Sequence, residues 1–139
     1  MTRLIVEADG GSRGNPGIAA GGAVVLDATD GQLLAEIGVY VGHASNNVAE
    51  YSGMIAGLRR AFEIAADAEV LVRMDSKLVV EQMMGRWKIK HPDMAELAGT
   101  ARELIAGRTV HFEWVPREQN KLADAMANQA MDAKASFLR

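Results

Sequence analysis

Residues 3–17 read RLIVEADGGSRGNPG, an apolar run that passes at Asp9 into a glycine-rich segment. The residues from Arg3 to Asp9 are rich in β-forming types and are predicted to form a strand. Four of the eight residues from Gly10 to Gly17 are glycine. Because glycine and proline interrupt both helices and strands, this segment is predicted to be a loop. Asp9 is therefore expected where a first strand enters a turn.

The elements after this loop indicate an α/β fold. Further strands are predicted at Gly22 to Leu26, Leu33 to Val41, Glu69 to Met74 and Thr109 to Val115, and helices at Val48 to Ala66, Ser76 to Met84, Asp93 to Ala106 and Lys121 to Lys134. Strands that are separated by helices pair in parallel through right-handed crossovers. We expect a mixed five-stranded sheet, with three antiparallel strands followed by two parallel ones, flanked by helices.

The composition is that of one folded domain. With 139 residues, 49% of them hydrophobic, the chain can close a single core, so one domain is expected over residues 1–139. It has no cysteine, which excludes a disulfide framework and favours a cytoplasmic location. No signal-peptide pattern or membrane-length apolar segment is present, so no membrane partner is expected. The net charge of −3 gives no bulk attraction to polyanions.

Four acidic residues stand at the ends of predicted elements, namely Asp9, Glu50, Asp75 and Asp124. Each has an ordinary interpretation, as an N-cap, as part of a capping box with Asn47, or as a charge in the first turn of a helix. Their joint placement favours a second interpretation, because ligand sites lie beyond the ends of adjacent parallel strands. Carboxylates that converge repel one another unless they are protonated or neutralised, and hard divalent cations such as Mg²⁺ are oxygen-bound. The sequence therefore predicts a metal site.

Four motifs together resemble type 1 ribonuclease H. They are Asp9-Gly10-Gly11-Ser12-Arg13-Gly14-Asn15-Pro16-Gly17, Ser45-Asn46-Asn47-Val48-Ala49-Glu50, Met74-Asp75-Ser76 and Asn120-Lys121-Leu122-Ala123-Asp124. The resemblance runs from Leu4 to about Ala133 and is greatest to compact prokaryotic members, some of which are N-terminal domains of larger proteins.

The resemblance implies a ribonuclease H-like sheet and hydrolysis of the RNA strand of an RNA/DNA hybrid. The four acids would hold two Mg²⁺ ions, with Mn²⁺ as an alternative, and the products would carry 5′-phosphate and 3′-hydroxyl ends. Two such ions activate a water and stabilise the leaving oxygen, so no protein nucleophile is needed. With the four acids neutralised, 14 of the 18 acidic residues remain against 15 basic ones. The net charge of the whole chain is therefore a weaker argument against a nucleic-acid partner.

The expected partner is an RNA/DNA hybrid duplex, bound by a monomer. Reading the 2′-OH distinguishes RNA from DNA, and the backbone of Gly10, Gly11 and Ser12 can approach a sugar closely. By resemblance, Asn15, Asn46 and Gln or Lys side chains lie at the minor groove, and Asn15, Ser45 and Asn46 would form a pocket for a DNA-strand phosphate. Lys77 and Arg117 are further candidates for substrate binding. Arg86, Lys88 and Lys90 flank Trp87 in one loop, an arrangement typical of nucleic-acid surfaces. Packing in the core is the alternative for Trp87.

Two departures from the family pattern concern loops. The segment from Gly85 to Pro92 is too short for the extra basic helix that many members use as a substrate handle. The loop from Pro116 to Asn120 lacks the histidine that many members have there, so Arg117 or Glu118 are candidates for a related role.

Three other functions compete with this one. A related metal-dependent nuclease is disfavoured by the glycine-rich loop, and a non-catalytic hybrid-binding module by the presence of all four acids. A phosphate binder would place its glycines before a helix, whereas these lead into a strand. Cleavage of RNA/RNA duplexes as a side activity stays open.

Overall fold

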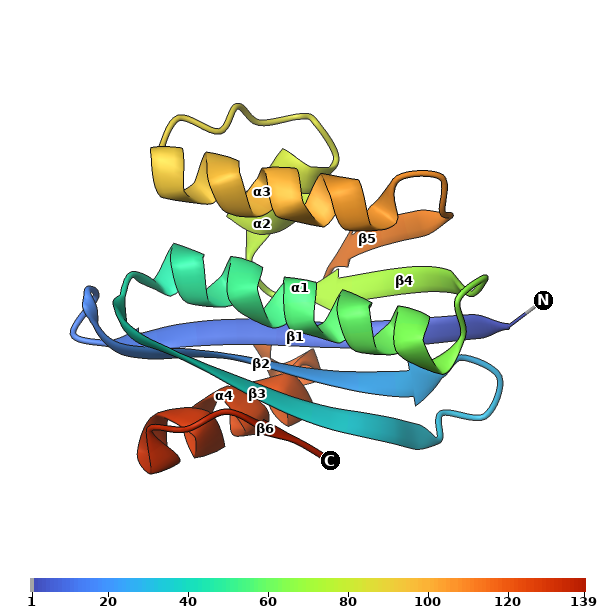
Figure 1. Cartoon of the computed structure of the whole chain (residues 1–139), viewed down its shortest axis with the longest axis horizontal. Coiled ribbons are helices and arrows are strands. Elements are labelled where there is room, and N and C mark those ends of the chain that lie inside the picture. The colour runs from blue at the N-terminus through green and yellow to red at the C-terminus, as the bar shows by residue number, and fades with distance from the viewer. Residues whose placement is uncertain (1) are drawn as a thin grey trace.

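The computed structural model describes residues 2–139, which form a six-stranded sheet flanked by helices (Figure 1). The strands are β1 (Arg3–Arg13), β2 (Gly17–Asp27), β3 (Leu33–Ala44), β4 (Glu69–Met74), β5 (Val110–Trp114) and β6 (Phe137–Leu138), in the order β5-β4-β1-β2-β3-β6. The helices are α1 (Asn46–Ile64), α2 (Lys77–Met83), α3 (Pro92–Ile105) and α4 (Lys121–Ala133), with a 3-10 turn at Arg117–Gln119.

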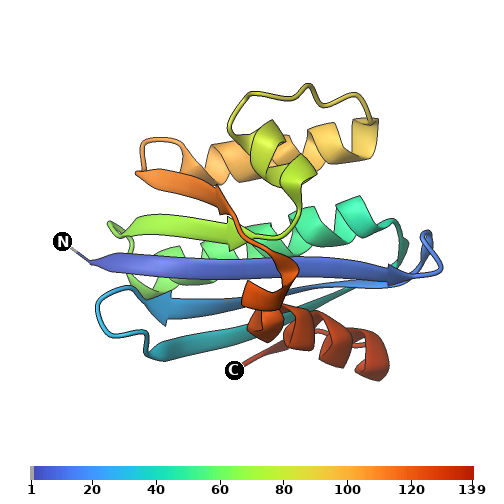
Figure 2. The same cartoon turned by 180° about the vertical axis from the view of Figure 1, so that it is seen from behind.

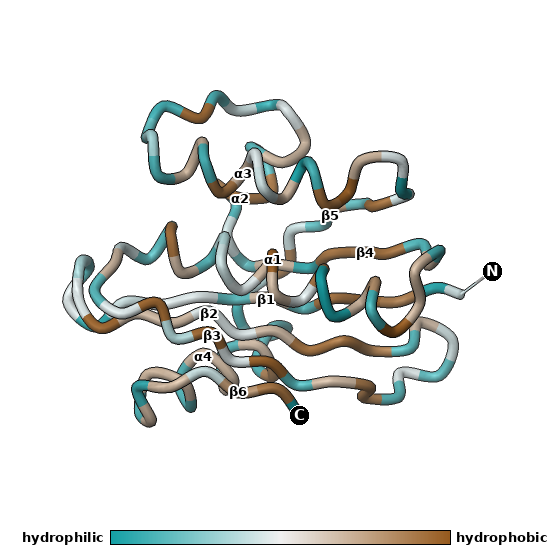
Figure 3. The backbone as a smooth tube through the Cα atoms, in the orientation of Figure 1, coloured by the Kyte–Doolittle hydropathy of each residue, from teal (hydrophilic) through white to brown (hydrophobic). Residues whose placement is uncertain are grey.

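The pairing confirms the predicted α/β class. β2 lies antiparallel to both β1 and β3, whereas β4 lies parallel to both β1 and β5. α1 crosses one face of the sheet against β1 and β2 and has α3 beside it, while α4 packs on the opposite face (Figures 1 and 2). Hydrophobic residues run along β4 and along parts of β1 and β2 (Figure 3). Within residues 2–139, none of the helices has the length and apolar character needed to cross a bilayer.

The loop predicted from Gly10 to Gly17 is confined to a turn over residues 14–16, because β1 continues through Arg13 and β2 begins at Gly17. The end of β1 pairs antiparallel with residues Ile18 to Gly21, so β2 also begins earlier than predicted. Gly10 serves close packing, since a Cβ there would overlap the backbone of Ala49 and Glu50 in α1, whereas Gly14, with a φ of +115°, lies in the turn between β1 and β2. Residue counts for turn formers could not reveal the packing of Gly10, because the partner helix lies far along the chain.

The sheet has one strand more than the five predicted. β6 pairs antiparallel with β3, and Glu36 and Arg139 exchange two backbone hydrogen bonds of 2.8 Å beside it. The Phe137 ring occupies the space that a Cβ on Gly38 would fill. A strand of two residues carries no alternation signal, which is why the sequence did not indicate it.

The helices begin and end within one or two residues of the predicted boundaries. Ser45 and Ser76 cap α1 and α2, each accepting a backbone N–H three residues on, at 3.3 and 3.2 Å. The caps are therefore serines, and neither Asp75 nor Asn47 fills that role. Capping does not account for the carboxylates of Asp75 and Glu50.

Gln82 is a buried polar residue whose hydrogen bonds join α1 to the segment after α2. The Tyr51 hydroxyl donates to Gln82 Oε1 at 2.7 Å, and Gln82 Nε2 donates to the Lys88 carbonyl at 3.2 Å. The Arg102 guanidinium donates to the Gln82 carbonyl at 3.1 Å. The network holds residues 84–91 against the helical layer.

The Tyr51→Phe substitution is expected to lower the free energy of unfolding by about 1–3 kcal/mol, because Gln82 Oε1 is left buried without its donor. The matched control is Tyr40→Phe, since the Tyr40 hydroxyl makes no hydrogen bond within residues 2–139. Urea denaturation of both proteins measures the difference. Equal losses in the two variants would contradict the role given to the Tyr51 hydroxyl.

Candidate active site

Two carboxylates leave neighbouring parallel strands at the same end. The last pair in the register of β1 and β4 is Ala8 with Met74, and Asp9 and Asp75 follow directly. The Asp9 residue is only 6% exposed. The register thus confirms that Asp9 and Asp75 are close neighbours.

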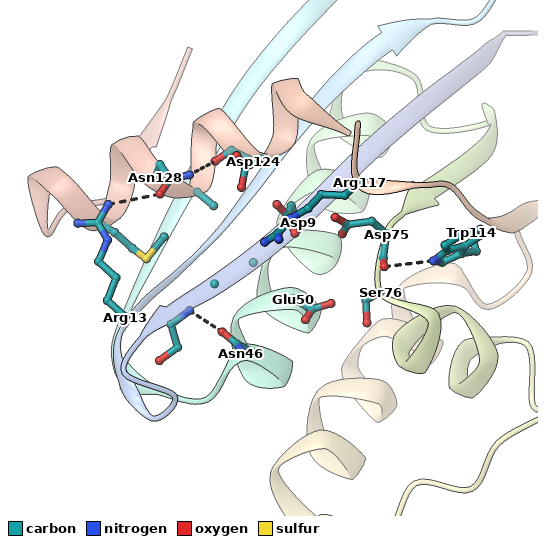
Figure 4. A pocket seen from close by; sticks show the side chains of 15 residues that line it. Asp9, Arg13, Asn46, Glu50, Asp75, Ser76, Trp114, Arg117, Asp124 and Asn128 are labelled. Carbon is teal, nitrogen blue, oxygen red and sulfur yellow. Dashed lines mark hydrogen bonds between the residues drawn. The ribbon is translucent and has the colours of Figure 1, made fainter. Parts of the chain in front are cut away.

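Glu50 reaches this place because α1 approaches β1 without intervening side chains. A Cβ on Gly53 of α1 would overlap the Asp9 carbonyl oxygen, and Gly10 is equally tight against the helix. Glu50 lies one turn before Gly53 and faces the same space as Asp9 and Asp75 (Figure 4). The glycines of β1 and α1 thereby set the approach of the third carboxylate.

Asp124 arrives from the opposite face of the sheet, in the first turn of α4 as predicted. The helix lies close to β2, where a Cβ on Gly22 would overlap the backbone of Ala123 and Ala127. All four predicted acids are thus carried by different elements, β1, α1, the end of β4 and α4.

Asn120 fastens α4 to β1, a role that sequence reasoning missed. Its side chain is fully buried, and its Nδ2 donates to the Ala8 carbonyl at 2.8 Å, directly before Asp9. Its Oδ1 has no hydrogen-bond partner among residues 2–139. Asn120 is part of the last motif, but the sequence did not indicate its hydrogen bond, because the partner lies 112 positions away along the chain.

The four acids line one cavity of about 650 Å³. Nine of the predicted site residues line it, namely Asp9, Gly10, Gly11, Ser12, Asn46, Glu50, Asp75, Arg117 and Asp124. Six further lining residues were not predicted, namely Arg13, Ser76, Trp114, Ala127, Asn128 and Met131. The predicted residues that do not line it are Asn15, Ser45, Lys77, Arg86, Lys88 and Lys90.

Hydrogen bonds order the wall of the cavity near Ser12. The Ser12 N–H donates to Asn46 Oδ1 at 2.7 Å, which orients the Asn46 amide. The Asn46 N–H in turn donates to Asn15 Oδ1 at 3.0 Å. Asn15 and the capping residue Ser45 thus have structural roles in positioning Asn46.

The cationic loop lies at a second cavity, of about 520 Å³, lined by Arg86, Trp87 and Lys88 among others. The Arg86 guanidinium binds both oxygens of the Glu81 carboxylate, at 2.6 and 2.8 Å, which lowers the pKa of Glu81. Arg86 is therefore already paired. Lys88 and Lys90 form no ion pair with any residue from 2 to 139.

Burial and mutual repulsion dominate the electrostatics of the four acids. Burial, then the charge of Asp75, raises the pKa of Asp9 to about 8, although a hydrogen bond from the Gly10 backbone lowers it. Burial also raises the pKa of Glu50 to about 7, against the lowering effects of the Ser76 hydroxyl and of Arg117. Glu50 Oε2 is buried without a hydrogen-bond partner in the described chain.

The donor set fits hard divalent cations. All four side chains offer oxygen, and a buried, unpartnered carboxylate oxygen is a ligand that a cation would satisfy. No group of three or more His, Cys, Asp or Glu side chains within residues 2–139 is arranged to hold a metal ion as it stands. Mg²⁺ does not require such a cage, because it is usually held by one or two carboxylates together with waters and substrate phosphates.

Known sequences match this chain over nearly its whole length. A family model described as "Reverse transcriptase-like" matches residues 7–130. The bifunctional protein Rv2228c of Mycobacterium tuberculosis is 55% identical over 134 residues, which are 96% of this chain but only 36% of that protein. Ribonuclease HI of Halobacterium salinarum is 44% identical over 128 residues, covering 89% of this chain and 62% of that protein. The chain thus spans about a third of the length of its mycobacterial relative.

Several solved structures are similar to this chain in both fold and sequence. The N-terminal RNase H domain of Rv2228c, as a fusion with maltose binding protein, has a TM-score of 0.91 and 54% identity, covering 96% of each chain. RNase H1 from Halobacterium salinarum has a TM-score of 0.88 and 42% identity, covering 94% of this chain and 98% of that one. LC11-RNase H1 in complex with an RNA/DNA hybrid has a TM-score of 0.89 and 39% identity, covering 95% and 99%. With its sheet order, its four acids and these relatives, the chain belongs to the type 1 ribonuclease H family.

Proposed function

We propose that this chain is an endoribonuclease that hydrolyses the RNA strand of RNA/DNA hybrids with two Mg²⁺ ions, for which Mn²⁺ can substitute. The observation that carries the proposal is the single cavity lined by Asp9, Glu50, Asp75 and Asp124. The hybrid complex of LC11-RNase H1, a protein 39% identical to this chain, supports the hybrid as substrate.

The part of the chain in the reaction is to supply the four carboxylates that would bind the ions. Ions bound by the four acids would activate a water for attack at phosphorus and stabilise the departing 3′ oxygen, giving 5′-phosphate and 3′-hydroxyl ends. Asp9 lies at the centre of the acids, since the charges of Asp75, Asp124 and Glu50 all raise its pKa. We assign it the largest part in holding the ions. No nucleophilic side chain is required.

Selection of the RNA strand is assigned to the wall formed by Gly10, Gly11, Ser12 and Asn46. A Cβ on Gly11 would meet only the tip of the Met131 side chain, at 3.4 Å, so a ribose can approach the strand closely at this glycine. The Asn46 Oδ1 accepts a hydrogen bond from the Ser12 N–H, and no residue from 2 to 139 accepts one from the Asn46 side-chain amide, so its N–H groups are left as donors. Donors held in place by such bonds can read a 2′-OH.

Contacts outside the cavity are assigned to strand phosphates. Lys88 and Lys90 lie on the loop after α2, and Lys77 opens that helix. Cations on flexible stems bind phosphates as point charges, so their contribution falls as salt is raised. We expect a substrate affinity that depends strongly on ionic strength.

The Arg117→Ala substitution is expected to move the pH–rate profile for hybrid cleavage to higher pH by about one unit, because a neighbouring positive charge favours an ionised carboxylate. Arg117 lowers the pKa of Glu50, so its loss leaves Glu50 protonated, and unable to hold a cation, over a wider range. Arg117→Lys should keep most of the wild-type profile. The control is Lys121→Ala, a cation four residues along the chain that does not line the acid cavity. An unshifted profile in Arg117→Ala would rule out this role.

The test of the proposed function is cleavage of a labelled RNA/DNA hybrid with Mg²⁺, beside lanes with EDTA, single-stranded RNA and an RNA/RNA duplex. We expect metal-dependent cutting that is confined to the RNA strand of the hybrid, with 5′-phosphate ends. The RNA/RNA lane reports how strictly the DNA strand is required. If the protein binds hybrid but fails to cut it in the presence of any divalent ion, the chain is a recognition module and the catalytic assignment is wrong.

A further inference from the structure

Trp114 is an exposed aromatic side chain on the wall of the acid cavity. It ends β5, lines the cavity and is 47% exposed. Its indole Nε1 donates to the Asp75 carbonyl at 3.2 Å (Figure 4). The ring therefore lies directly beside one of the four acids and is fixed to the backbone of that residue.

The surroundings of Trp114 hold the ring in one place. Trp114 pairs with Met74 in the register of β4 and β5, and the Val115 N–H donates to the Met74 carbonyl at 2.9 Å. Backbone pairing thus fixes the base of the side chain, and the bond to Asp75 fixes its far end. A large aromatic surface that is ordered and open to a cavity can bind a ligand at little entropic cost.

We propose that Trp114 contacts the substrate, with its ring packing against the ribose next to the phosphate that the four acids address. This inference rests on the proposed function. The nucleotides that flank such a phosphate meet the walls of the cavity, and Trp114 is the aromatic residue among its lining groups. The sequence holds one other tryptophan, Trp87, which lies at the second cavity.

The two tryptophans allow the contact to be observed without measuring cleavage. The Trp87→Phe and Asp9→Asn double variant leaves Trp114 as its one tryptophan and should keep the hybrid intact in Mg²⁺. Titration with an RNA/DNA hybrid should change the Trp114 emission and reach saturation. A DNA duplex of the same sequence, which lacks the ribose, should require at least about tenfold higher concentration. If hybrid binding is detected by anisotropy of a labelled strand while the emission stays constant, the contact is absent.

Steady-state kinetics separate the ring from its N–H group. Trp114→Leu, which removes the aromatic face from the ribose, should raise KM about tenfold. Trp114→Phe keeps a ring and should stay within about twofold of the wild-type KM. Thermal melting of both variants checks that they fold as the wild type does.

The outcomes distinguish this inference from the proposed function. If the wild type fails to cut hybrid with Mg²⁺, the proposed function itself fails. If the wild type cuts hybrid and Trp114→Leu has the same KM, only the assignment of Trp114 is overturned. A raised KM in Trp114→Leu that Trp114→Phe does not share supports the aromatic contact.

Discussion

The Asp9→Asn substitution is expected to lower the rate of hybrid cleavage by about a thousandfold, which corresponds to about 4 kcal/mol of transition-state stabilisation. The same change should raise the free energy of unfolding of the metal-free protein at neutral pH. The two effects have one cause, which is the placement of a carboxylate where three others surround it.

The loss of activity follows from the part assigned to Asp9 in holding the ions. An amide is isosteric with the carboxylate but carries no negative charge, so the attraction for both cations falls together. The gain in stability follows from burial. Asp9 is 6% exposed, and the charges of Asp75, Asp124 and Glu50 raise its pKa along with the burial. At neutral pH the metal-free folded chain must therefore hold a proton on Asp9, and a neutral amide removes the free-energy cost of that protonation.

Activity assays with Mg²⁺ measure the rate of hybrid cleavage, and urea denaturation in EDTA measures the free energy of unfolding. The control is Asp67→Asn, because Asp67 is exposed in the turn before β4 and faces none of the four acids. The control should change neither quantity. Full activity in Asp9→Asn would remove the central role of this residue, and a destabilised variant would show that its charge is compensated in the fold.

Hydrophobic periodicity in the sequence was sufficient to predict most of the fold. The apolar faces of α1 and α4 and the alternation in β5 depend on neighbours three or four positions, or two positions, away. The run from Gly10 to Arg13 could not be interpreted in this way, because Gly10 is required by the backbone of α1, which packs directly on it. Local counting treats glycine as a turn former, whereas here it permits a helix and a strand to touch.

In the candidate site, too, some residues could be predicted from the sequence and others could not. The acids could be predicted because they stand at element ends in a recognisable order. Asn120 and Trp114 could not, because their roles depend on single hydrogen bonds to the carbonyls of Ala8 and Asp75, 112 and 39 positions away. The pairing of Arg86 with Glu81 was not predicted either, because Arg86 lies beyond the end of α2, five positions from Glu81, where helical spacing no longer applies.

The stability of the metal-free protein is expected to fall as the pH is raised from about 5 to about 8. The pKa of Asp9 is about 8 in the folded chain against 3.8 as the ordinary value, and that of Glu50 is about 7 against 4.5. Between these limits the folded state binds more protons than the unfolded state, so stability decreases with pH, by about 1.4 kcal/mol per pH unit for each group. The contribution is complete below pH of about 4 and is lost as pH passes through 7 and then 8. The raised pKa of Glu7, caused by burial, acts in the same direction.

Magnesium should reverse this loss, because cations and protons compete for the same oxygens. A ligand that binds only the folded state at a hundred times its Kd adds about 2.7 kcal/mol, so Mg²⁺ should restore stability at pH 8 and do little at pH 5. Urea denaturation at both values, with EDTA and with Mg²⁺, measures the coupling in wild type and in Asp9→Asn. Removing Asp9 should flatten the slope above pH 7 and weaken the effect of Mg²⁺. A wild-type slope equal to that of Asp9→Asn would mean that the proton on Asp9 is not what stabilises the empty site, and that the four acids are neutralised by other means.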